Sequence, residues 1–304
     1  MAQEKWLVEP GESKTIDVAL VRALKVSFVG GQIDIIGHDE PGARVEIHSV
    51  SGRDLKVTID GDRLEIDHPQ LRWDNFIEVF KSLRSNAKAD VSVLVPRDVA
   101  LKFGIVSANA LVSGLVTDAK LSTVSGDLVV DGLTGNLELN GVSGELSVRD
   151  HTGRITAHTV SGDVTATGDI TRFNADGVSG NVLLDISGTP DEVNVNSVSG
   201  DLTLRIPDAV GARYRINTVS GRMQLDNAVL HGPAGKGFSG TTGTLNGSWV
   251  DVSVNTVSGD VSVLRSAAGA TGSDGVAGTT GTAGSTGSAG SGSARSNGAN
   301  GATA

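Results

Sequence analysis

The tripeptide Val-Ser-Gly recurs along this chain of 304 residues, with a series of seven copies from residue 124 onward. The copies begin at Val124, Val142, Val160, Val178, Val198, Val219 and Val257, and the first four lie 18 residues apart. A weaker echo falls midway between them, at residues 133–135 and 151–153. A fixed short period of this kind is typical of a solenoid, in which each repeat buries its apolar face against its neighbours.

The repeating unit is nine residues long. It carries Ser or Thr at position 2, Gly at position 3 and apolar or small residues at positions 5 and 7. Leu128, Leu137 and Leu146 stand at position 5 of successive units. Alternate side chains of a strand share a face, so each unit is predicted to be a tight turn and a short strand. Two such half-coils would make one coil of 18 residues, with glycine at the turn for positive φ or close backbone approach.

The sequence predicts an all-β fold in three parts. Residues 1–100 form an N-terminal β-rich part, with strand-like segments at 25–29, 32–36, 44–48, 55–59 and 63–67 and glycine turns between several of them, including 30–31. Residues 101–265 hold the regular nine-residue repeats and continue the same domain. Residues 266–304 are almost entirely Gly, Ala, Ser and Thr, which predicts a disordered tail because they offer too little apolar area to offset ordering.

One short segment changes period. Between about residues 71 and 84, Trp73, Phe76, Ile77 and Phe80 recur at helical spacing and predict an amphipathic helix. We expect this helix to cover an open end or side of the sheet, since exposed edges invite aggregation. A docking role for the same four residues, on a partner or an anionic membrane surface, is the alternative.

Two columns of turn residues contain side chains that could act in catalysis or metal binding, but each column has a simpler structural explanation. The serines of the tripeptide could be nucleophiles, but no His-Asp pair recurs beside them, so a structural hydrogen-bonded ladder is favoured. These serines are Ser125, Ser143, Ser161, Ser179, Ser199, Ser220 and Ser258. The residue after each glycine is mostly acidic, which favours a solvated turn edge over a calcium ladder because the alternate units carry Asn136, Arg154 and Arg172.

Composition restricts the remaining functions. The net charge of −10 disfavours nucleic acid, and the absence of cysteine excludes thiolate sites. The six histidines have no metal-ligand spacing, and no catalytic residue, cofactor site or metal site is predicted. The polar N-terminus does not read as a signal peptide, and the stretch 18–29 is too short and too charged to span a bilayer. A cytoplasmic protein is expected, with no membrane contact.

Three stretches of sequence carry a resemblance to a known family. They are residues 31–39, the strand-like segment 91–96 that ends in proline, and the repeated Thr-Val-Ser-Gly-Asp turn. Over about residues 15–265 the chain resembles a bacterial β-strand-repeat domain of unknown function, labelled "putative adhesin" and related to toastrack domains of envelope-stress proteins. The resemblance implies a single-stranded right-handed β-helix with no enzymatic activity and no catalytic residues.

Together these observations predict a non-enzymatic β-solenoid that serves as a scaffold or interaction module for an unknown protein partner, in a bacterial envelope-stress or regulatory system. Self-polymerisation through the solenoid ends is a second hypothesis. A polysaccharide-binding or polysaccharide-degrading β-helix is a third, although the repeats hold very few aromatic residues.

Overall fold

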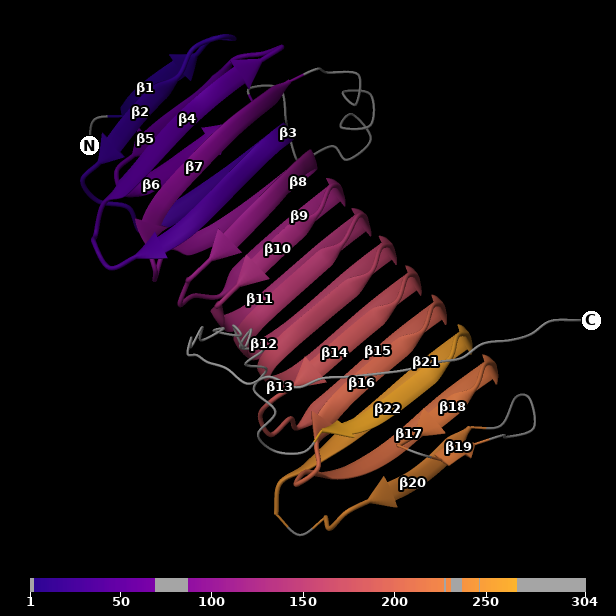
Figure 1. Ribbon diagram of the computed structural model, residues 1–304. Helices are drawn as coiled ribbons and strands as arrows, with labels where there is room; N and C mark the ends of the chain where they lie inside the picture. The colour runs from indigo at the N-terminus through magenta and orange to yellow at the C-terminus, as the bar shows by residue number, and fades with distance from the viewer. Residues whose placement is uncertain (1–2, 69–86, 227, 231–236, 246, 267–304) are drawn as a thin grey trace, which may run out of the picture. The chain divides into compact units, whose positions relative to one another are not determined.

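A computed structural model describes residues 3–68, 87–226, 228–230, 237–245 and 247–266, all within one compact unit, residues 1–269. Every regular element in these ranges is a β-strand, so the predicted all-β class is confirmed (Figure 1). Within the same ranges there is no helix that is long and apolar enough to cross a membrane. The helix predicted over residues 71–84 lies outside the described residues, as does the tail after Ser266, the residue that ends the last strand.

In the described ranges, twenty-two strands make up one sheet. The first seven are β1 Gln3–Val8, β2 Lys14–Val18, β3 Ala23–His38, β4 Ala43–Ser51, β5 Leu55–Asp60, β6 Arg63–Asp67 and β7 Lys88–Pro96. The next nine are β8 Ala100–Ser113, β9 Ala119–Ser125, β10 Leu128–Asp131, β11 Thr134–Ser143, β12 Leu146–Ser161, β13 Val164–Ser179, β14 Val182–Ile186, β15 Glu192–Ser199 and β16 Leu202–Pro207. The last six are β17 Gly211–Ser220, β18 Met223–Leu225, β19 Ala228–Leu230, β20 Phe238–Thr242, β21 Trp249–Ser258 and β22 Val261–Ser266.

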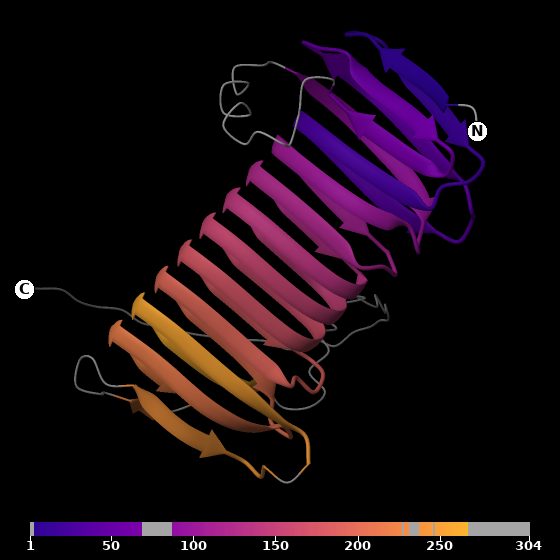
Figure 2. The same ribbon diagram turned by 180° about the vertical axis from the view of Figure 1, so that it is seen from behind.

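The repeats stack as parallel strands (Figures 1 and 2). Leu128 pairs with Leu146, and Leu146 pairs with Val164, so residues one tripeptide period apart lie side by side. The side chains at positions 5 and 7 of the unit form columns inside the stack. Leu137, Leu146 and Phe173 are fully buried, as the alternation predicted. These columns are the continuous core of the domain.

The N-terminal strands agree with the predicted segments, with one difference. Residues 30–31 were expected to form a turn, but β3 runs through them from Ala23 to His38. Gly31 has a φ of +107°, and this bends the strand while its pairing continues with Ala89 of β7 and Ala108 of β8. The bend replaces a turn because both halves of β3 have neighbours to pair with.

The last coil is out of chain order. Strand β21 pairs in parallel with β15 on one side and with β17 on the other, so it lies between two strands that precede it in the sequence (Figure 1). Strand β22 is inserted in the same way between β16 and β18. Arg213 on β17 holds the inserted coil, with its guanidinium 4.5 Å from the Trp249 ring and an ion pair to Asp251.

Two histidines are buried among apolar residues. His68 lies edge-on to Phe28, and its Nδ1 accepts a hydrogen bond from the Val29 amide at 3.4 Å. His151 is next to Leu133 of the adjacent coil, since Thr134 pairs with Thr152, and its ring makes no hydrogen bond of ordinary geometry with the described residues. Burial lowers the pKa of His68 to about 4 and also lowers the pKa of His151.

These histidines predict a loss of stability in acid. An unfolded histidine has a pKa of about 6.5, so below that pH the unfolded chain binds more protons than the folded chain. The free energy of unfolding is therefore expected to fall as the pH drops from 7 toward 4, by about 3 kcal/mol for His68 alone. His151→Leu is expected to reduce this pH dependence and to stabilise the fold at pH 7 by about 1 kcal/mol, because an unsatisfied polar ring is removed. Urea unfolding between pH 4 and 7.5 tests both statements, and an unchanged slope in the variant would contradict the second.

Candidate functional site

The valines of the repeated tripeptide form a row that is exposed from Val160 onward. Pairing of the adjacent serines places the coils in the order Val124, Val142, Val160, Val178, Val198, Val257 and Val219. Val124 is only 8% exposed and packs on Val106, whereas the five valines from Val160 onward are 50–56% exposed. At about 4.8 Å per strand, this valine row is about 29 Å long. A contiguous line of exposed apolar side chains is a feature of interaction surfaces.

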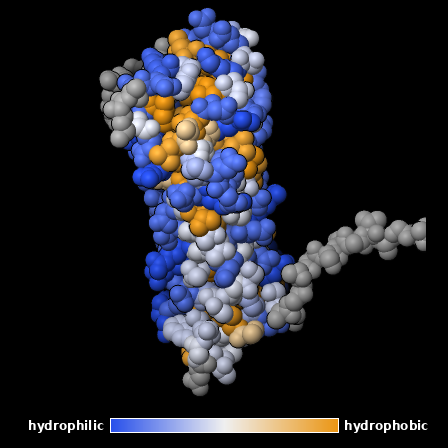
Figure 3. Space-filling view, turned by 90° about the vertical axis from the view of Figure 1, so that its left-hand side faces the viewer, coloured by the Kyte–Doolittle hydropathy of each residue, from blue (hydrophilic) through white to orange (hydrophobic). Residues whose placement is uncertain are grey.

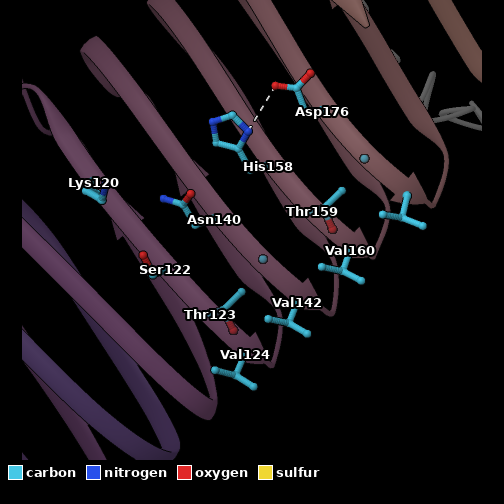
Figure 4. Close-up of a pocket in the computed structure, with 13 residues that line it drawn as sticks. Lys120, Ser122, Thr123, Val124, Asn140, Val142, His158, Thr159, Val160 and Asp176 are labelled. Carbon is cyan, nitrogen blue, oxygen red and sulfur yellow. Dashed lines mark ion pairs between the residues drawn. The ribbon is translucent and has the colours of Figure 1, made fainter. Parts of the chain in front are cut away.

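A row of polar side chains runs parallel to the valine row, two residues earlier in each coil. Asn217 donates through Nδ2 to Asn255 Oδ1 at 2.8 Å. Asn255 donates to Asn196 Oδ1, and Asn196 donates to Asp176 Oδ1, both at 2.9 Å. On the other side Asp176 Oδ2 lies 3.4 Å from Nδ1 of His158 (Figure 4). The polar row is therefore a hydrogen-bonded chain over four coils that reaches a fifth through the Asp176–His158 contact, and it holds its side chains in fixed positions.

Small residues lie between the two rows and make the floor of a groove. Two hollows of about 530 and 400 Å³ share Asp176, Gly177 and no other lining residue, so they join into one groove. Gly141 and Gly177 present no side chain at the floor, and Thr123, Thr218 and Thr256 are buried there. Valines form one wall and the polar row forms the other, as Figure 4 shows for the coils of β9, β11 and β12.

The groove carries little charge on an acidic protein. Among the residues that line it, only Lys120, His158 and Asp176 can be charged, although the whole chain has a net charge of −10. Asp176 is paired with His158, and Lys120 is paired with Glu138. On the face seen in Figure 3, apolar residues gather over the N-terminal strands, and hydrophilic residues predominate along the two sides of the stack below them. Charge depletion next to exposed apolar groups is characteristic of the centre of an interface.

The acidic turn column bonds one coil to the next. Asp127 Oδ1 accepts the Glu145 amide at 3.0 Å, and Asp163 Oδ1 accepts the Asn181 amide at 2.7 Å. The series continues through Asn181 and Asp201 to Asp260, which accepts the Arg222 amide. Within the described residues, no group of three or more His, Cys, Asp or Glu is arranged to hold a metal ion. The column therefore has a structural role in satisfying turn amides.

This role predicts a difference between two substitutions of Asp163. Asp163→Asn keeps the Oδ1 acceptor, as the natural Asn181 does one coil further on, so the free energy of unfolding should change by less than about 0.5 kcal/mol. Asp163→Ala removes the acceptor of the Asn181 amide and should cost about 1 kcal/mol. Urea denaturation of both variants measures the difference, and equal effects would contradict a role for the oxygen.

The structure places the residues singled out in the sequence as follows. The seven serines lie in one register column across consecutive coils. Ser143 donates to the Val124 carbonyl at 3.2 Å and Ser179 donates to the Val160 carbonyl at 3.5 Å, so these two hydroxyls bond carbonyls of the preceding coil. Trp73, Phe76, Ile77 and Phe80 lie outside the described residues.

The groove itself was missed in the sequence. The repeat pattern assigned no separate role to the tripeptide valine, although its neighbours differ from those of the alternate units. The residue two places before the valine is Ser122, Asn140, His158, Asp176, Asn196, Asn217 or Asn255, whereas the equivalent residue of the alternate units is often charged, such as Asp131, Arg149 and Arg205. The gathering of amides on one edge was the available signal.

The fold and groove define a β-solenoid-like stack with an extended, weakly charged surface groove. The chain belongs to the family described as Toastrack DUF4097, whose model matches residues 21–264. The resemblance inferred from the repeated turn is therefore confirmed. No curated protein matches the chain.

Several solved structures are similar to this chain at low identity. A "putative adhesin" from Bacteroides fragilis is 15% identical, with 83% of this chain and 97% of that chain covered and a TM-score of 0.41. A "putative lipid binding protein" from Parabacteroides distasonis is 11% identical, with 85% and 97% covered and a TM-score of 0.38. A "putative cell adhesion protein" from Clostridium sporogenes is 16% identical, with 87% and 99% covered and a TM-score of 0.28. At TM-scores this low, none of these likenesses bears on the function of the chain.

Proposed function

We propose that this toastrack domain is a non-enzymatic interaction module that binds a protein partner through the groove. The observation that carries the proposal is the row of five half-exposed valines beside a polar row whose side chains are already fixed by hydrogen bonds. Fixed side chains lose little conformational entropy on binding, and the valines supply apolar area. The uncharged amides of the polar row have donors and acceptors that the row itself does not use, and these are available to the partner.

The dimensions of the groove indicate what kind of binding to expect. A surface about 29 Å long and three residues wide, or about 10 Å, covers roughly 300 Å². Stable protein interfaces bury about 800 Å² on each side, so the groove alone supports a weak or transient complex. A narrow, extended segment of a partner fits this surface better than a broad face. None of the described residues that line the groove is aromatic, so the lining does not favour the polysaccharide alternative.

The finer architecture forms part of the same proposal. We infer that the stack is a single-stranded right-handed β-helix of nine-residue half-coils. Support comes from parallel pairing one full period apart, as between Leu137 and Ile155, and from the two kinds of edge that alternate along the chain. In such a helix the seven tripeptides from Val124 onward lie on one edge, which is what makes the valine row continuous.

Site-specific photocrosslinking in the native host tests the proposed function. A photoreactive amino acid at Val178 or Val198 should give adducts with one protein partner, because these side chains line the groove. The matched control is Leu183, which is 46% exposed on β14 and lies outside the groove lining. Adducts of the same size and yield from all three positions, or none from the valines, would refute a binding role for the groove.

A further inference from the structure

The coil at the C-terminal end of the stack is covered by antiparallel strands. Strand β20 pairs with β17, with Tyr214 opposite Gly240 and Ile216 opposite Phe238. Strand β19 pairs with β18 in the same antiparallel sense. Among the described residues, β20 has no strand on its other side, so one row of its backbone groups is unpaired (Figure 1). A free edge of this kind can pair with another strand.

The edge of β20 lacks the usual protection. Its five residues, Phe-Ser-Gly-Thr-Thr, include no charged side chain. The strands that end the sheet at the other extreme, β1 and β2, carry Glu4, Lys5, Lys14 and Asp17. Charged side chains on an edge strand oppose pairing with a second strand. The two ends of the stack therefore differ, and only the β20 end is suited to strand addition.

Strand β20 is also anchored to the stack, so its backbone is in position to pair with a second strand. Phe238 packs against the core, and its ring lies over Gly240, where a Cβ would collide with it. Ser239 and Thr241 point to the exposed face, opposite Arg215 and Arg213 of β17. The strand is thus anchored on its inner face and presents only hydroxyls on its outer face.

We propose that β20 pairs with β20 of a second copy of this chain, antiparallel and about a two-fold axis. A strand that pairs with its own copy across a two-fold axis must run antiparallel to it, and β20 is already an edge of an antiparallel pair. The uncharged edge lets two molecules of net charge −10 approach at the point where repulsion is least. Two-fold pairing occupies the free edge of β20 in both copies, so growth through this contact stops at a dimer. A head-to-tail filament would instead have to pair β20 with the charged strands β1 and β2.

Sedimentation equilibrium of the full chain over a wide concentration range tests the proposal. The wild-type chain should change from monomer to dimer with rising concentration and should not exceed two copies. Ser239→Glu combined with Thr241→Glu should weaken the dimer at least tenfold, because carboxylates of the two copies would face each other. Within each monomer the new carboxylates lie opposite Arg215 and Arg213, so folding should be preserved, which circular dichroism verifies.

The control adds the same charges in the middle of the stack. Thr152→Glu combined with Ser187→Glu places two carboxylates at exposed positions away from β20 and should leave the dimer unchanged within twofold. Equal weakening by both double variants would mean that net charge is responsible and would overturn the proposal. A strictly monomeric wild-type chain would also overturn it, as would growth beyond two copies.

Discussion

Replacing Leu146 by Asp is expected to unfold the stack around β12. Leu146 is 1% exposed and lies between Leu128 and Val164 in the central column of the core. Losing a buried leucine costs about 2–5 kcal/mol, and an unpaired carboxylate in the same place costs several more. The sum approaches the whole stability of a typical domain, which is about 5–15 kcal/mol. Urea unfolding followed by circular dichroism should show loss of the transition or a shift of more than about 5 kcal/mol.

The control for this prediction is Leu183→Asp. Leu183 belongs to β14, the next coil but one, and is 46% exposed. The same chemical change there should alter the free energy of unfolding by less than about 1 kcal/mol, because the carboxylate stays in water. Similar destabilisation by both variants would mean that the inner and outer faces of the strands are assigned the wrong way round.

Replacing Gly180 by Ala is the second large effect expected. Gly180 has a φ of +133°, where residues with a Cβ are strained, and its Cβ would collide with the backbone carbonyl of Gly162 in the adjacent coil. The strain alone costs about 1–3 kcal/mol, and relieving the collision would push two coils apart and lengthen their hydrogen bonds. We expect a loss of at least about 3 kcal/mol in urea unfolding.

Gly177→Ala is the matched control, three residues earlier and still within β13. Gly177 does not have a positive φ, and its Cβ would be 3.5 Å from Thr159 Cγ2, an ordinary contact. This variant should remain within about 1 kcal/mol of wild type. If Gly180→Ala were equally mild, the glycine at position 3 would not be required for close approach of the coils.

The glycine column also resolves an alternative that the sequence left open. Positive φ and close backbone approach both explain a glycine at every turn. Gly180 and Gly200 combine the two, but Gly162 has no positive φ and still lies against the carbonyl of Gly144. Close approach is therefore the reason shared by the column, and it could be established only from the packing of one coil on the next.

The sequence by itself determined the strand composition, the inward positions 5 and 7 and the period at which coils stack, because each depends on local alternation and on turn glycines. Burial of Leu137 and Phe173 follows directly from that pattern. The groove could not be predicted from this pattern alone. It depends on which of two similar edges of the stack exposes the tripeptide valines. Neighbouring coils had to be in place before Val160 could be seen as exposed and Leu133 as buried, although both begin equivalent units.

The order of the coils was decided only by the tertiary structure. Every tripeptide coil presents the same columns, so β21 can stack on β15 as well as β17 can, and local pattern does not choose between them. The choice depends on the chain between β18 and β21, which returns as antiparallel β19 and β20 and covers the outer side of the β17–β18 coil. That coil can then accept β21 and β22 only on its inner side, where Arg213 meets Trp249 and Asp251.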